Sequence, residues 1–190
     1  MLDKELKFDR YENSFLWLKD AGVVLPVYNV DAPVLPLKAS KNSNVFKLFS
    51  SDAGLLTSAY PAETKIELLN KNGEVNNGAH FENAVAQQLT ANGFEPYFCK
   101  KKNTGELDIL IEMGGKVVPI EVKSGKSYKV HKALDNFMKV SDYHIEKAYV
   151  FSTGNVEKEG VVTYFPIYMC YLLKERKLGK LIVELDMEGL

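Results

Sequence analysis

The fold of this chain is decided by the stretch ELDILIEMGGKVVPIEVK, residues 106–123. Two nearly apolar runs flank Gly114 and Gly115, and both glycines can adopt the positive φ angles that a two-residue hairpin turn requires. With these glycines as the loop, the hairpin register brings Asp108 directly opposite Glu121. The alternation of the ladder makes this a non-hydrogen-bonded pair, whose Cα atoms lie about 4.5 Å apart.

The facing carboxylates carry like charges, which destabilise a sheet unless a raised pKa, solvent exposure or a bound cation relieves the repulsion. The period of two along a strand places Lys123 on the same face as Glu121. Two carboxylates and one ammonium suit a hard cation such as Mg²⁺, which prefers oxygen ligands and keeps several waters. The alternative is that these side chains form the solvated face of a half-exposed hairpin. The nearly continuous apolar character of both strands speaks against it.

The order of elements around this hairpin predicts an α/β fold with a mixed central sheet flanked by helices. The elements follow from hydrophobic periodicity and from glycine, proline and N-cap signals. Helices are expected over residues 8–21, 53–60 (with Asp52 as N-cap), 63–69, 79–91 (with Gly93 just past its end), 130–140 and 167–173. Strands are expected over residues 23–30 (an edge strand or an extended arm because of Pro26), 45–49, 95–100, 106–113, 116–123, 148–152, 161–164 and 181–185.

A polar stretch rich in Asn and Gly, residues 70–78, marks a boundary between two parts of the chain. Residues 1–77 are expected to form a small N-terminal α+β accessory region. Its stripe of Phe15, Trp17 and Leu18 indicates a packing or partner surface. Residues 78–190 are expected to form the main domain, which contains the hairpin.

Composition excludes several classes of protein. The chain has 190 residues, of which 46% are hydrophobic, and a net charge of -1, so it is neither disordered nor globally attracted to polyanions. Its two cysteines are too few for a disulfide scaffold. The N-terminus is charged, and no stretch reaches the roughly 18–20 apolar residues that span a bilayer. We therefore expect a cytoplasmic protein with no membrane partner.

The motif of Asp108 followed on the returning strand by Glu121-Val122-Lys123 resembles the core of the PD-(D/E)XK nuclease superfamily. That family usually adds a glutamate on the preceding helix, and Glu82 matches it. The proline of the family name is not beside Asp108, where Leu107 stands. The resemblance implies a restriction-endonuclease-like core.

By that resemblance, Asp108, Glu121 and the carbonyl of Val122 would bind Mg²⁺ or Mn²⁺. Glu82 would bind a second metal or hold a metal-bound water. Lys123 would orient or deprotonate the attacking water and stabilise charge on the phosphate. Phosphodiester hydrolysis needs an activated water and charge neutralisation, and a metal supplies both. The alternative for Glu82 is a favourable acidic residue in the first turn of a helix.

Five segments spread over most of the chain carry a second resemblance: Phe15–Val24, Lys47–Leu56, Gly78–Asn83, Glu106–Leu110 and Ile120–Gly125. Together they resemble the uncharacterised C-terminal domain (DUF4143-type) of bacterial and archaeal AAA-type ATPases. This resemblance implies an ATPase module as a partner in cis in full-length relatives.

A local excess of lysine around the hairpin indicates a polyanionic partner. Lys126, Lys129 and Lys132 are three residues apart and could form one stripe beside the site, with Tyr128 available for stacking. We expect them to bind nucleic acid, with DNA favoured over RNA. The alternative is a solvated helix start.

Two functions stay open at this point. The first is a metal-dependent nuclease or a nuclease-like DNA-binding module. The second is a non-catalytic accessory module of an ATPase that keeps the nuclease fold. Facing carboxylates favour the first function, because a scaffold has no need of them. A sugar- or nucleotide-binding enzyme has no phosphate loop or nucleophile triad to support it.

Overall fold

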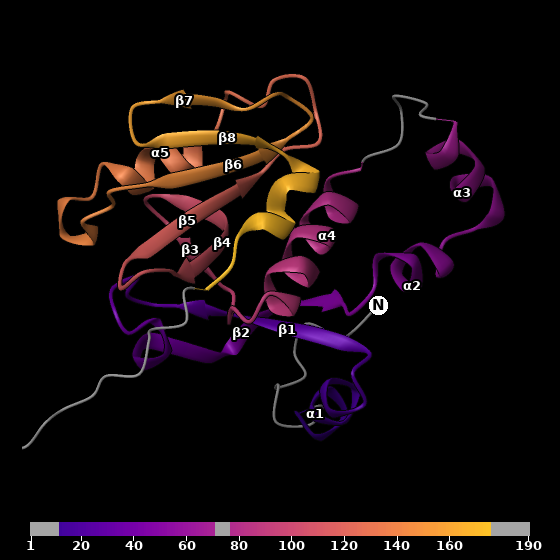
Figure 1. Cartoon of the computed structure of the whole chain (residues 1–190). Helices are drawn as coiled ribbons and strands as arrows, with labels where there is room; N and C mark the ends of the chain where they lie inside the picture. Colours follow the sequence, from indigo (N-terminus) through magenta and orange to yellow (C-terminus); the bar gives the residue numbers. More distant parts are fainter. Residues whose placement is uncertain (1–11, 71–76, 176–190) are drawn as a thin grey trace, which may run out of the picture.

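The computed structural model describes residues 12–70 and 77–175. They form one mixed sheet of eight strands, in the order β2-β1-β3-β4-β5-β6-β8-β7 (Figure 1). The strands are β1 Val24–Val30, β2 Lys41–Ser50, β3 Tyr97–Lys101, β4 Gly105–Glu112, β5 Val117–Val122, β6 Ala148–Ser152, β7 Glu157–Glu159 and β8 Val162–Pro166. The expected α/β fold with a mixed sheet is therefore confirmed.

Helices cover both faces of the sheet (Figure 1). Val85 and Leu89 of α4 pack on one face against Ile109 and Ile120. Leu134 and Phe137 of α5 pack on the other face. The α-helices are α1 Glu12–Asp20, α2 Ala53–Ser58, α3 Ala62–Leu69, α4 Gly78–Ala91 and α5 Lys132–Met138; the 3-10 turns are η2 Leu37–Ser40, η3 Ser141–Tyr143 and η4 Ile167–Leu172.

The β4–β5 hairpin has the predicted register. Ile109 pairs with Ile120 and Glu112 with Val117. Gly114 and Gly115 have φ angles of 63° and 71°, the left-handed values that a tight hairpin turn needs at both central positions. The loop residues and the pairing of the strands are thus confirmed up to Ile109–Ile120.

The position of β1 corrects one prediction. Pro26 was expected to make this segment an edge strand or an extended arm, yet β1 lies between β2 and β3. Its parallel pairing with β3 covers only Tyr28 and Asn29, so Pro26 lies where β1 has no β3 partner. The missing N–H of Pro26 therefore costs no ladder bond on that side.

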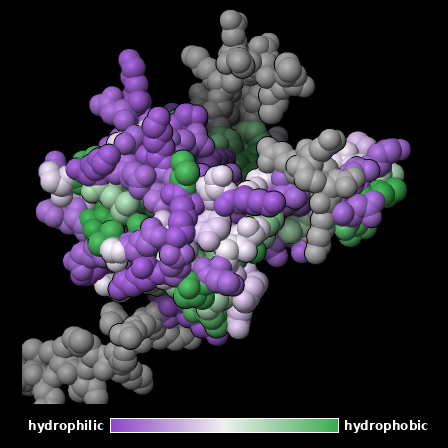
Figure 2. Space-filling model, turned by 90° about the horizontal axis from the view of Figure 1, so that it is seen from above, coloured by the Kyte–Doolittle hydropathy of each residue, from purple (hydrophilic) through white to green (hydrophobic). Residues whose placement is uncertain are grey.

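The edges of the sheet are instead β2 and β7. The three residues of β7, Glu157–Glu159, are all exposed, and charged edge strands discourage pairing with other chains. Seen from above, the surface of the molecule shows mostly hydrophilic residues (Figure 2). The purely charged sequence of β7 has no hydrophobic alternation, so the sequence offered no sign of this strand.

Local signals predicted most helix starts. The side chain of Asp52 accepts the N–H of Leu55, as expected for an N-cap. Helix α5 begins at Lys132 and not at Val130, and the expected C-terminal helix is the 3-10 turn η4. The expected strand 181–185 lies outside the described residues, as does the start of the first expected helix.

The boundary at residues 77 and 78 stays a prediction. Strands β1 and β2 come from the N-terminal region, but they belong to the same sheet as β3–β8. Among the described residues, no helix is long and apolar enough to cross a bilayer.

Candidate metal and nucleic-acid site

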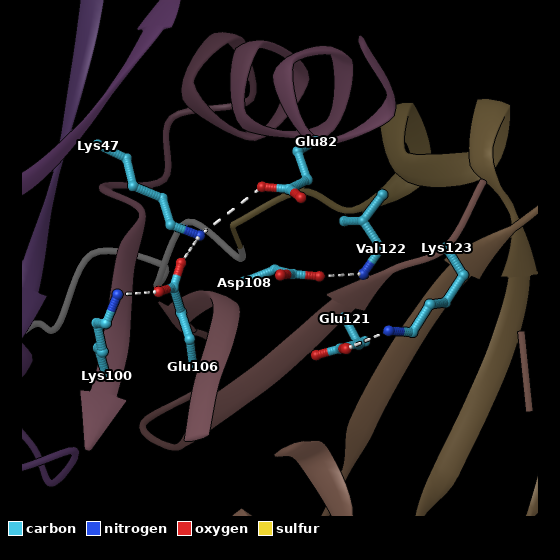
Figure 3. A network of polar contacts seen from close by, with 8 residues as sticks. All are labelled: Lys47, Glu82, Lys100, Glu106, Asp108, Glu121, Val122 and Lys123. Carbon is cyan, nitrogen blue, oxygen red and sulfur yellow. Dashed lines mark hydrogen bonds and ion pairs between the residues drawn. The ribbon is translucent and has the colours of Figure 1, made fainter. Parts of the chain in front are cut away.

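Glu82 lies in the second turn of α4, and its side chain points toward the ends of β4 and β5 (Figure 3). The next residue, Asn83, is 2% exposed and binds the backbone of Ser50 twice. Its Oδ1 accepts the N–H of Ser50 at 2.7 Å, and its Nδ2 donates to the Ser50 carbonyl at 3.1 Å. This double contact fixes the start of α4 against the end of β2.

Asp108 lies where β4 and β5 separate. In a regular ladder the N–H of Val122 would donate to the carbonyl of Leu107. It donates instead to Oδ2 of Asp108, at 2.8 Å. The carboxylate therefore stands between the strands and replaces a backbone bond.

The predicted face-to-face pair is corrected by this geometry. The paired register stops at Ile109–Ile120, one residue pair short of Asp108 and Glu121. The two carboxylates are near enough for the charge of Asp108 to raise the pKa of Glu121, but they are not a ladder pair. The physical reason is that the carboxylate of Asp108 accepts the N–H of Val122, which a regular ladder would direct to the carbonyl of Leu107.

Glu121 is the most buried of the three carboxylates. The residue is 4% exposed, and its Oε1 accepts a hydrogen bond from Nζ of Lys123 at 2.7 Å. Its Oε2 is buried and has no hydrogen-bond partner among the described residues. Burial, followed by the charge of Asp108, raises the pKa of Glu121 to about 7.

The other two carboxylates are also shifted toward their neutral forms. Burial raises the pKa of Glu82, and the charge of Asp108 raises it further. Burial also raises the pKa of Asp108, against the opposing effect of the Val122 N–H. Lys123 responds in the complementary direction: burial lowers its pKa, but the hydrogen bond to Glu121 and the charges of the carboxylates raise it overall. Such mutually shifted groups in one place are typical of functional sites.

Three further residues belong to this network of charged groups, and no pattern in the sequence assigned them to the site. Nζ of Lys47, in β2, lies 2.8 Å from Oε1 of Glu106 and 3.7 Å from Oε2 of Glu82. Lys100 contacts the other oxygen of Glu106 at 2.8 Å (Figure 3). Lys47 precedes Glu82 by 35 positions in the sequence, so no local motif could connect them.

Of the three lysines in the predicted stripe, Lys126 and Lys129 lie in the irregular segment from Ser124 to His131, and Lys132 is the first residue of α5. Lys126 and Lys132 are exposed. Lys129 is held by two glutamates of β7, with its Nζ 2.7 Å from Glu157 and 2.6 Å from Glu159. The binding of nucleic acid by these lysines stays a prediction.

Tyr128 is part of the fold rather than a free stacking platform. It is partly buried, and its ring meets that of Tyr164 edge to face, with 5.9 Å between centroids. It also lies so close to Gly154 that a Cβ there would be 2.5 Å from Cζ of Tyr128. His131 is likewise buried, and its Nε2 lies 2.8 Å from the hydroxyl of Tyr164.

The donor set suits a hard divalent cation, because it consists of carboxylate oxygens, one of which is buried with no hydrogen-bond partner in residues 12–70 and 77–175. As arranged here, however, the described residues hold no group of three or more His, Cys, Asp and Glu side chains placed to bind one metal ion. Each carboxylate has its own partner: Lys47 for Glu82, the Val122 N–H for Asp108 and Lys123 for Glu121. The chemistry of the residues therefore fits a metal. Cation binding would require the carboxylates to exchange these hydrogen bonds and ion pairs for contacts with the metal.

Comparison with known proteins assigns part of the chain to a family. Residues 77–170 match the family model described as Domain of unknown function (DUF4143). No curated protein and no solved structure matched the chain. The match includes Glu82, Asp108, Glu121 and Lys123, and it excludes Lys47. Residues 77–170 of this chain are therefore a DUF4143 domain.

Proposed function

We propose that this domain is a nuclease-like module that hydrolyses phosphodiester bonds of nucleic acid with the aid of Mg²⁺ or Mn²⁺. The observation that carries the proposal is the state of Glu121. A carboxylate that is 4% exposed, with one oxygen unpartnered in the described part of the chain, is costly to keep in a fold. A cation bound beside Glu121, the two other carboxylates and Lys123 would offset this cost.

The residues of the site would have two roles, binding of the metal and orientation of the attacking water. Asp108, Glu121 and the carbonyl of Val122 would hold the first metal, and Glu82 would hold a second metal or a metal-bound water. A bound metal would polarise the phosphate and lower the pKa of a water. Lys123 would orient that water and neutralise charge on the phosphate; its ammonium lies 2.7 Å from Oε1 of Glu121, beside the proposed metal ligands.

The arrangement resembles the PD-(D/E)XK pattern of an acidic residue, a hairpin and Glu-x-Lys. The topology is compatible with that resemblance: α4 precedes an antiparallel run β3-β4-β5, and α5 then leads to β6, which is parallel to β5. The exposed lysines Lys126 and Lys132, with Lys129, are the proposed contacts for the polyanion, and DNA is the favoured substrate.

A nuclease assay tests the proposal. The purified chain is incubated with end-labelled single-stranded and duplex DNA and RNA, in Mg²⁺, Mn²⁺ or EDTA. We expect metal-dependent cleavage that Asp108→Asn and Glu121→Gln abolish. Glu146→Gln is the matched control, since it removes an exposed glutamate that also pairs with a lysine, Lys116, but lies outside the proposed site. Cleavage that survives both site substitutions would refute the assignment.

A second candidate function is a non-catalytic accessory or DNA-binding module of an AAA-type ATPase. It is favoured by the pairing of Glu82 and Glu121 with lysines, which gives these charges a structural explanation. Calorimetric Mn²⁺ titration separates the two functions. Binding that Glu121→Gln removes supports the nuclease-like site, whereas the absence of binding to a folded wild-type chain supports the accessory module.

A further inference from the structure

Lys47 connects the N-terminal region to the acidic site. It belongs to the edge strand β2, outside the matched residues 77–170. Its ammonium lies between Glu82 on α4 and Glu106 on β4, 3.7 Å from the first and 2.8 Å from the second. The side chain is 20% exposed and passes over the ring of Phe98, with Nζ 5.1 Å from the centroid. The ammonium of Lys47 is therefore enclosed by Glu82, Glu106 and the ring of Phe98.

The strand that carries Lys47 is held in place by the same helix that carries Glu82. Asn83 binds both backbone groups of Ser50, three residues along β2 from Lys47. Oε1 of Gln87, one helical turn later, accepts the N–H of Ala53 at 3.0 Å. Since α4 positions both partners, the ion pair between Lys47 and Glu82 is a built feature of the fold and not a chance meeting of surface side chains.

We propose that Lys47 is a positioning residue that supplies the counter-charge to Glu82 in the metal-free site and competes with a divalent cation for that carboxylate. Lys123 has the corresponding place beside Glu121, 2.7 Å from its Oε1. Two of the three carboxylates, Glu82 and Glu121, are thus each paired with an ammonium group, one from each part of the chain. This inference rests on the proposed function, because it takes the site to be one that binds a cation.

The charge of Lys47 has opposite effects on Glu82 and on a divalent cation. An ammonium near Glu82 stabilises that carboxylate when no metal is present, and it repels a divalent ion that approaches the same oxygens. Removing one positive charge about 6 Å from a divalent ion is worth about tenfold in affinity at a water-like dielectric. The repulsion is screened by salt, so the effect should shrink as ionic strength rises.

Isothermal titration of Mn²⁺ into the full chain tests this, at low ionic strength and above the pKa of Glu121, which is about 7. Lys47→Met removes the charge and keeps the length of the side chain, and we expect about tenfold tighter binding. Lys47→Arg keeps the charge and should bind as the wild type does. The matched control is Lys100→Met, because Lys100 is the other lysine on Glu106 and no ion pair joins it to Glu82 or Asp108 in the described part of the chain.

Thermal unfolding in EDTA supplies a readout that does not depend on metal binding. We expect Lys47→Met to lower the Tm of the metal-free chain, and Mn²⁺ to raise its Tm by more than it raises that of the wild type. Lys47→Gln is a second variant of smaller bulk if the methionine variant fails to fold. Equal Mn²⁺ affinity in the wild type, Lys47→Met and Lys47→Gln would overturn the role of Lys47.

The outcomes separate this inference from the proposed function. Binding in the wild type without a change in the Lys47 variants overturns the inference alone. Binding seen only after Lys47 is replaced supports the competition. No binding in any folded variant, Lys47→Met included, overturns both the cation site and the role of Lys47.

Discussion

The buried carboxylate of Glu121 predicts an unusual dependence of stability on pH. Its pKa is raised from 4.5 to about 7 in the fold, first by burial and then by the charge of Asp108. Between these two values the unfolded chain is ionised at this position while the folded chain keeps its proton. Stability from this group therefore falls as pH rises through that window, and the full cost is present above the folded pKa.

The magnitude follows from the shift. A rise from 4.5 to about 7 corresponds to roughly 3 kcal/mol of unfolding free energy at high pH. Glu121→Gln places a neutral side chain of the same shape at the site and removes this cost. The variant should be more stable than the wild type by up to about 3 kcal/mol near pH 8, and the difference should vanish near pH 4.

Urea unfolding in EDTA, followed by circular dichroism from about pH 4 to about pH 8, measures this difference. Glu106→Gln is the control with the opposite sign. Burial raises the pKa of Glu106, but the hydrogen bonds from Lys100 and Lys47 outweigh it and lower the pKa overall. That variant should therefore lose stability at high pH and approach the wild type in acid. A stability difference between Glu121→Gln and the wild type that does not change with pH would refute the reasoning.

Three further predictions concern the fold around the site. Asn83→Ala leaves both backbone groups of Ser50 unpaired and should cost about 2 kcal/mol of unfolding free energy in urea titration. Gly154→Ala places a Cβ 2.5 Å from Cζ of Tyr128 and should cost about 1–3 kcal/mol by overpacking; Tyr128→Leu should relieve most of that loss in a double-mutant cycle of melting curves. Gly115→Val puts a β-branched residue at a φ of 71° and should cost more than about 1 kcal/mol by the same assay.

The hairpin shows what local sequence determines. Two glycines between apolar runs permit one tight turn, and the turn sets every pair back to Ile109–Ile120. The same holds for Asp52, whose side chain caps α2 because its acceptor lies within reach of a backbone N–H three residues later. These features depend on contacts of short range along the chain, so a pattern of residue types suffices to predict them.

The candidate site was predictable only in part. Asp108, Glu121 and Lys123 could be named from the hairpin register, and Glu82 from the family resemblance. The structure places Nζ of Lys123 2.7 Å from Oε1 of Glu121, and the function of the four residues stays a prediction. The exact placement of Asp108 could not be predicted. Asp108 accepts the N–H of Val122 because β4 and β5 separate at this point. The hydrophobic periodicity of the sequence does not specify where two strands separate.

The sequence by itself determined the hairpin, its register and the residue types that can serve a cation. Tertiary structure alone decided that β1 lies inside the sheet and that Lys47 reaches Glu82 from a strand 35 positions earlier in the chain. It also left one oxygen of Glu121 buried and unpartnered among the described residues. The physical reason is that charge neutralisation and burial depend on distances in space, and strand order sets these distances without leaving a local pattern.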